Sequence, residues 1–209
     1  MPLQNRVTPT GDIVAMPARG MFTGNRGIIH DPETRTLLNR RWASRAWLIC
    51  ALQWRGVRRT VMGTHSWTEL FFMDEATALA AGHRPCFRCR RVAATAFQAG
   101  FPSRHHARPR ASDIDRILHS ERLEGRRKRL HDLPSPAAAL PDGAMIFQDG
   151  APHLILNGLA RRWSLHGYGA PTAPLDGARL ITPPSTVAAL RAGYQPRLHA
   201  SALGGVIPD

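Results

Sequence analysis

The stretch that decides the fold is residues 70–91, LFFMDEATALAAGHRPCFRCRR. It predicts the end of a strand, then a short helix that Asp74 caps and Gly82 ends. Directly after the helix comes a CxxC pair, Cys86 and Cys89. Because such a pair on a tight turn presents two thiolates to one metal ion, the sequence predicts half of a zinc site here.

Outside this stretch the chain has only one more cysteine, Cys50. Three cysteines suit a reducing compartment and a metal better than a disulfide framework. Hydrophobic residues make up 43% of the 209 residues, which is typical of a globular protein. No long uncharged apolar run and no basic-then-apolar leader pattern stands out, so we expect a cytoplasmic protein without a membrane partner.

The charge of the chain is strongly positive and unevenly placed. Arginine and lysine total 28 against 15 acidic residues, a formal net charge of +13. Residues 84–130 carry 13 of these cations against 4 acids, whereas residues 131–209 are neutral overall. Arginine binds phosphate in a bidentate manner and also stacks on bases. The charge therefore favours a nucleic-acid partner, DNA or RNA, while a GC-rich genome would equally explain the preference for arginine over lysine.

We expect an α+β fold: a β-hairpin-rich zinc module with short helices, a basic helix, and a second small β-rich unit ending in a short helix. The predicted boundaries are 1–20 for a loosely docked arm, 21–102 for the zinc module, 103–134 for the basic helical segment and 135–209 for the C-terminal unit. The expected strands are 47–54, 57–62, 68–72, 144–148, 153–156, 159–165 and 180–182, and the expected helices are 75–81, 90–99, one capped by Ser112 and 185–192.

A weak internal repeat pairs residues 74–89 with residues 184–199. In the second copy Arg197 stands where the first cysteine of the pair would be, so that copy cannot bind metal in the same way. The similarity has two explanations: a degenerate duplication, or the fact that a strand followed by a turn, a helix and a glycine is a common local arrangement.

Residues 71–91 resemble the zinc-binding module of the Ada DNA-repair protein family. The resemblance rests on Phe71-Phe72, on the helix 75–81, and on the run Gly-His-Arg-Pro-Cys-Phe-Arg-Cys at 82–89. It implies four zinc ligands, two of them from an upstream loop that begins Gly-Ile-aromatic-Cys. The nearest equivalent, Gly27-Ile28-Ile29-His30, places His30 at a ligand position, where a histidine cannot accept the methyl group that this family takes from DNA. Methyl-phosphotriester repair is therefore not expected, whereas DNA binding is.

The predicted zinc ligands are His30, Cys50, Cys86 and Cys89, with His65 as the substitute. A cysteine in a strand, such as Cys50, is often only a small core residue. The Pro-Cys-x-x-Cys run also occurs in nucleobase deaminases, but these need an upstream His-x-Glu, and the chain has this pattern only after the pair.

Two runs of basic residues are the predicted phosphate contacts. They are Arg84, Arg88, Arg90 and Arg91 around the cysteine pair, and Arg126, Arg127, Lys128 and Arg129 further on. We therefore predict a zinc-containing nucleic-acid-binding protein, most simply DNA-binding, in DNA repair or processing.

An enzyme is the first alternative, namely a DNA-repair hydrolase such as a glycosylase or nuclease. Glu121 would be its acid–base residue, because it continues the apolar helical stripe of Ile114, Ile117 and Leu118. A helix-end glutamate paired with a nearby arginine is the simpler interpretation of Glu121. A protein-interaction module, whose charge reflects genome composition, is the second alternative.

Overall fold

Helix α1 (Glu75–Ala80) forms at the centre of the molecule, and all six of its residues are buried. Asp74 begins the helix, because its carboxylate accepts hydrogen bonds from the Thr77 backbone and hydroxyl at 2.8 and 2.7 Å. Gly82 follows with φ of +89°, as the sequence predicted for the helix end. The computed structural model describes residues 1–57, 60–64, 66–103 and 108–204.

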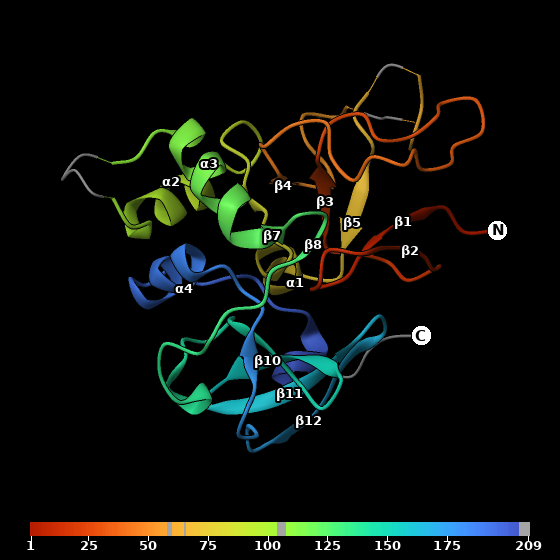
Figure 1. Ribbon diagram of the computed structural model, residues 1–209. Coiled ribbons are helices and arrows are strands. Elements are labelled where there is room, and N and C mark those ends of the chain that lie inside the picture. Colours follow the sequence, from red (N-terminus) through yellow and green to blue (C-terminus); the bar gives the residue numbers. More distant parts are fainter. Residues whose placement is uncertain (58–59, 65, 104–107, 205–209) are drawn as a thin grey trace.

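Two β-sheets lie on either side of α1, as Figure 1 shows. The first has six strands in the order β2-β1-β5-β3-β4-β6. Its strands are β1 (Gln4–Val7), β2 (Ile13–Ala15), β3 (Phe22–Asn25), β4 (Leu48–Cys50), β5 (Leu70–Phe72) and β6 (Arg84–Pro85). Strands β4 and β6 pair in parallel, which joins the strand before the cysteine pair to a strand far upstream in the chain.

The second sheet has five antiparallel strands in the order β12-β11-β10-β9-β13. Its strands are β9 (Met145–Gln148), β10 (Ala151–Leu156), β11 (Leu159–Ser164), β12 (Gly167–Thr172) and β13 (Arg179–Leu180). Two-residue turns, Asp149-Gly150 and Asn157-Gly158, join β9 to β10 and β10 to β11. All four turn residues have positive φ, which is the conformation that matches the twist of a two-residue hairpin.

Three longer helices and two short 3₁₀ turns complete the fold. They are α2 (Arg91–Gly100), α3 (Ala111–Arg122), α4 (Pro184–Arg191), η1 (Ala137–Ala139) and η2 (Ala200–Leu203). Helix α4 packs against α2 and α3, so that one apolar cluster runs from Phe72 and Phe97 to Ile146 and Val187. The α+β class is confirmed, and the main core is shared between the predicted zinc module and the C-terminal unit.

Several sequence-based expectations differ from the structure. Residues 1–20 are not a loose arm, because β1 and β2 form a hairpin whose Val7 and Ile13 are buried in the first sheet. The strand expected over 47–54 is limited to β4, and the described part of 57–62 contains no strand. Helix α3 begins one residue earlier than its predicted cap, and Asp113 accepts a bond from the Arg110 backbone at 3.3 Å.

The basic run after α3 is a hairpin and not the continuation of a helix. Strands β7 (Leu123–Glu124) and β8 (Arg127–Lys128) pair antiparallel around Gly125, which has a φ of +60°. The helix therefore ends at Arg122, and the run projects from a tight turn. Within the described residues, no helix is long and apolar enough to cross a membrane.

Candidate metal centre and cationic pocket

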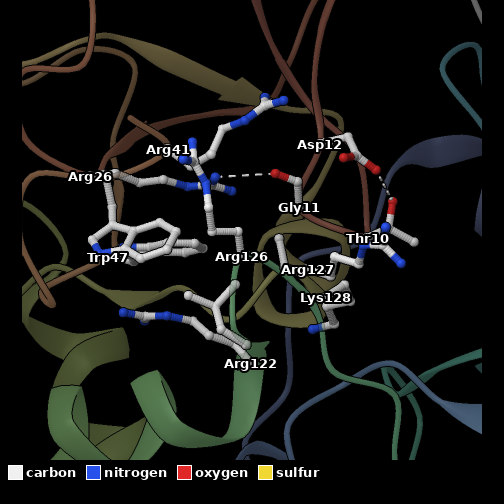
Figure 2. A pocket seen from close by; sticks show the side chains of 13 residues that line it. Thr10, Gly11, Asp12, Arg26, Arg41, Trp47, Arg122, Arg126, Arg127 and Lys128 are labelled. Carbon is white, nitrogen blue, oxygen red and sulfur yellow. Dashed lines mark hydrogen bonds between the residues drawn. The ribbon is translucent and has the colours of Figure 1, made fainter. Parts of the chain in front are cut away.

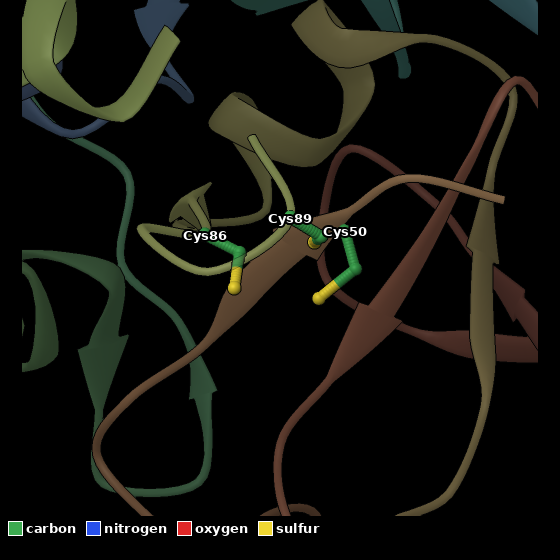
Figure 3. Close-up of side chains that lie close together, drawn as sticks. All are labelled: Cys50, Cys86 and Cys89. Carbon is green, nitrogen blue, oxygen red and sulfur yellow. The ribbon is translucent and has the colours of Figure 1, made fainter. Parts of the chain in front are cut away.

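The three cysteines of the chain lie together, and this cluster is the candidate metal centre (Figure 3). Their sulfur atoms all lie within 4.8 Å of one another. The parallel pairing of β4 with β6 explains the approach, because the Cys86 backbone N–H donates to the Ile49 carbonyl at 3.0 Å. Cys50 follows Ile49 directly and therefore meets the cysteine pair.

The geometry of the cluster fits a thiolate-bound metal ion. A tetrahedral zinc ion with Zn–S bonds of about 2.3 Å places its sulfur ligands about 3.8 Å apart, and the sulfur atoms here lie within 4.8 Å of one another. Cys50 and Cys86 are buried, whereas Cys89 is partly exposed and its sulfur accepts a bond from the Ala51 backbone at 3.4 Å. The cluster can therefore hold a metal ion; the donor set favours zinc or another thiophilic metal.

The close approach of the thiols also changes their protonation. A hydrogen bond from Cys50, and then one from Cys89, lowers the pKa of Cys86, while hydrogen bonds to Cys86 and then to Cys89 raise the pKa of Cys50. One thiolate is thus favoured before any metal binds. A bound cation favours the thiolate form of all three, and metal binding would then release protons.

His30 is not a member of this cluster, which corrects the ligand set expected from the sequence. Its side chain is buried, with Nδ1 2.6 Å from the Thr68 hydroxyl and Nε2 3.1 Å from the Gly63 carbonyl. Both ring nitrogens are therefore used in holding the loop before β5. His65, the substitute, lies outside the described residues. Since structural zinc sites have four ligands, His65 stays a sequence-based prediction for the fourth.

Single replacements of the two histidines should separate these assignments. We expect His30→Ala to keep the metal content of the wild type, because one ring nitrogen contacts Thr68 and the other contacts Gly63. We expect His65→Ala to lower it. Metal analysis of both purified variants is the measurement, and metal loss from a folded His30→Ala protein would contradict the assignment.

A second site, here called the cationic pocket, lies beside Trp47 (Figure 2). It has a volume of about 420 Å³. Six cationic side chains and one acidic side chain line it, namely Arg26, Arg41, Arg122, Arg126, Arg127, Lys128 and Asp12. Three of the cations come from the β7–β8 hairpin, so the tight turn at Gly125 is what brings the basic run to the pocket.

Two buried arginines form the inner wall of the cationic pocket. The guanidinium carbons of Arg26 and Arg122 lie 3.8 and 3.9 Å from the Trp47 ring centroid, and Figure 2 shows them on opposite sides of the indole. Gly82 makes room for this arrangement, because a Cβ there would lie 2.6 Å from the Arg122 side chain. The Arg122 guanidinium in turn donates to the Gly82 carbonyl at 2.9 Å.

Burial and mutual repulsion disfavour the protonated forms of the basic side chains in this pocket. Burial, then Arg122, lowers the pKa of Arg26. Burial lowers the pKa of Arg122 to about 9, and burial, then Arg122 and Arg26, lowers the pKa of Lys128 to about 7. Because arginine stays protonated in proteins, the lowered pKa values express the free-energy cost of holding the cations close together.

A shallower groove continues from the cationic pocket. It is lined by Asn39, Arg40, Arg41, Trp42 and Arg126, and it shares the last three with the pocket. Arg126 donates to the Asn39 carbonyl and also lies 3.2 Å from its side-chain oxygen, which joins the hairpin to the 39–42 loop. Trp42 is partly exposed and packs 6.1 Å from the Trp47 ring.

Of the four predicted phosphate contacts near the cysteines, two form ion pairs within the fold and two are exposed. Arg84 is buried and forms a bidentate ion pair with Asp115, with both bonds at 2.8 Å. Arg90 bonds to Glu75 at 2.6 Å. Both are therefore neutralised by acids within the fold and are not free for phosphate. Only Arg88 and Arg91 of that group are exposed.

Of the four residues in the second basic run, three line the cationic pocket and one does not. Arg126, Arg127 and Lys128 line the cationic pocket, whereas Arg129 donates to the Ser120 carbonyl at 3.1 Å. No local signal in the sequence marks Arg26 and Arg122 as partners of Trp47. Their association depends on contacts between segments about 20 to 100 residues apart.

Glu121, the candidate acid–base residue, caps a helix. Its two carboxylate oxygens accept bonds from the Ser185 backbone at 3.1 Å and from the Ser185 hydroxyl at 2.6 Å, at the first turn of α4. The pairing with a nearby arginine that we gave as the simpler interpretation is not found in the described residues. The carboxylate joins α3 to α4, and a catalytic role for Glu121 stays a prediction.

The chain matches no protein-family model, no curated protein and no solved structure.

Proposed function

We propose that this chain is a zinc-containing nucleic-acid-binding protein that contacts phosphates through the cationic pocket and its adjoining groove. The observation that carries the proposal is the pocket itself, where six cations face a single acid beside two tryptophans. Phosphate neutralisation by arginine and lysine supplies most of the affinity of such proteins, and an exposed indole stacks on bases.

The metal would have a structural part in this function. Strands β4 and β6 carry the cysteine cluster at one end, while at the other end the Arg84 backbone N–H donates to the Trp47 carbonyl at 3.0 Å. Zinc at the cysteines would fix this strand pair, and with it the position of Trp47 between the two arginines. The resemblance of residues 71–91 to the Ada module supports a place in DNA repair or processing.

Salt dependence of binding tests the proposal. In the variant Arg41→Gln/Arg126→Gln/Arg127→Gln, single-stranded DNA binding should weaken, and the slope of log K against log salt should become shallower by roughly 0.7 for each lost phosphate contact. Fluorescence anisotropy at several salt concentrations measures this slope.

The matched control removes the same charge from the other half of the molecule. The variant Arg162→Gln/Arg179→Gln/Arg191→Gln changes three arginines of the C-terminal unit that lie outside the pocket and the groove. Its slope should stay close to that of the wild type. Equal slopes for both triple variants would show that binding reflects net charge alone. Unaltered binding by the pocket variant would contradict the pocket as the contact surface and favour Arg88 and Arg91 instead.

A further inference from the structure

Neither of the two arginines that enclose Trp47 has an acid within ion-pair distance in the described part of the chain. Both are 1% exposed, yet neither has an ion pair among the described residues. Arg26 donates instead to the His83 ring at 3.1 Å and to the Gly11 carbonyl at 3.1 Å. Buried arginines are normally paired with an acid, as Arg84 is with Asp115 in this same protein.

Each of these arginines also has a buried hydrogen-bond donor without an acceptor within the described residues. Nη2 of Arg26 and Nε of Arg122 are buried and have no partner in the described part of the chain. Burial of a donor without an acceptor is costly, and for a charged group the cost is larger. Among the described residues, the two arginines of the inner wall therefore have no ion pair, and one donor atom of each has no acceptor.

The neighbouring groups meet these needs only in part, because Asp12 attracts Arg26 and Asp115 attracts Arg122 without forming an ion pair with them. His83 is held neutral, because burial and then Arg26 and Arg122 lower its pKa, and it offers one ring nitrogen to Arg26. The one acid of the pocket, Asp12, is exposed and accepts a bond from the Thr10 hydroxyl at 2.9 Å. An external anion with several acceptor oxygens would meet both needs.

We propose that the cationic pocket binds a phosphomonoester dianion, carried on the end of a nucleic-acid strand or on a free nucleotide. This inference rests on the proposed function and names the group that the pocket recognises. A monoester carries a charge of about −1.5 to −2 at pH 7 and three acceptor oxygens, whereas a backbone diester carries a single charge. Arg26 and Arg122 both line the pocket, and a terminal phosphate enters such a recess more easily than one flanked by sugars on both sides.

The adjoining groove can hold the base and the next phosphate of the ligand. Trp42 lies at the boundary between pocket and groove, with Arg40 and Arg41 beside it. A nucleotide whose phosphate enters the pocket can therefore stack its base on Trp42 and direct the following phosphate to these arginines. A duplex end would have to open first, so the pocket favours an unpaired strand end.

Three oligonucleotides of the same sequence test this inference: one with a 5′-phosphate, one with a 3′-phosphate and one with hydroxyls at both ends. Anisotropy at fixed salt should show that at least one phosphorylated strand binds wild type about tenfold or more tightly than the unphosphorylated strand. Adenosine monophosphate as a competitor distinguishes a strand end from a free nucleotide. Equal binding of all three strands would overturn the inference but leave the proposed function standing, whereas no binding of any strand at low salt would overturn both.

The variant for this test is Lys128→Met. Lys128 is partly buried in the pocket, and its loss removes a charge that the fold holds at a cost. The preference for phosphorylated strands should shrink several-fold in this variant, because binding of the phosphorylated strand should weaken more than binding of the unphosphorylated one. Arg162→Met is the control and should keep the preference. Thermal unfolding in inorganic phosphate against sodium chloride of equal ionic strength gives a second readout, and phosphate should raise the Tm of wild type more than that of Lys128→Met. An unchanged preference and an unchanged phosphate effect in Lys128→Met would count against the pocket.

Discussion

Freshly purified protein should contain about one zinc ion per chain, and Cys86→Ser or Cys89→Ser should contain almost none. The three sulfur atoms already lie within 4.8 Å of one another, so one metal ion can join β4 to the turn after β6. Each variant leaves only two thiolates, which is too few to hold zinc tightly. Metal analysis by mass spectrometry measures the result.

Loss of the metal should also lower stability by a large amount. Zinc supplies about 10–16 kcal/mol to zinc-finger peptides that cannot fold without it. This chain has its own apolar core, so we expect a smaller share, a few kcal/mol, which would lower the Tm by on the order of 10 °C. A chelator should lower the Tm of wild type to that of Cys86→Ser and leave the variant unchanged. Wild-type protein that is fully folded and free of metal would contradict this prediction.

The sequence predicted all three cysteines of the cluster and, through the resemblance, one residue that lies outside it. The CxxC pair, the Asp74 cap and the short helix before it depend on neighbouring residues, and the structure has all three. The contact between Cys50 and the pair depends on the parallel pairing of β4 with β6 across more than thirty residues. His30 took its place in the predicted set from the resemblance, and local spacing does not reveal that Thr68 and Gly63 occupy its ring.

Charge counts from the sequence placed the cations in the right part of the chain but not their partners. Arg84 and Arg90 looked like phosphate contacts, yet Asp115 and Glu75 neutralise them inside the fold. The cationic pocket was found only in part, through the run at 126–128. Arg26 stood outside both basic runs, and its contact with Trp47 appears only once β3 and β4 lie side by side.

Glu75 is the residue whose removal should cost the most stability outside the metal centre. It lies on α1, is 1% exposed, and accepts bonds from Arg90 at 2.6 Å, from the Tyr194 hydroxyl at 2.5 Å and from the Arg197 backbone at 3.1 Å. These partners come from the start of α2 and from the segment after α4. One carboxylate thus joins the cysteine-bearing half of the molecule to the C-terminal unit.

Glu75→Ala should lower the free energy of unfolding by about 3–5 kcal/mol, because it leaves the charge of Arg90 and the Tyr194 hydroxyl without an acceptor in a buried place. Urea unfolding followed by circular dichroism measures this loss. Asp132→Ala is the control, since its ion pair with Arg179 is exposed and should contribute no more than about 1 kcal/mol. The double variant Glu75→Ala/Arg90→Met should be less destabilised than the sum of its single variants, because it no longer leaves an unpaired buried charge. Additive losses would mean that Glu75 stabilises the fold through Tyr194 and Arg197 and not through its ion pair with Arg90.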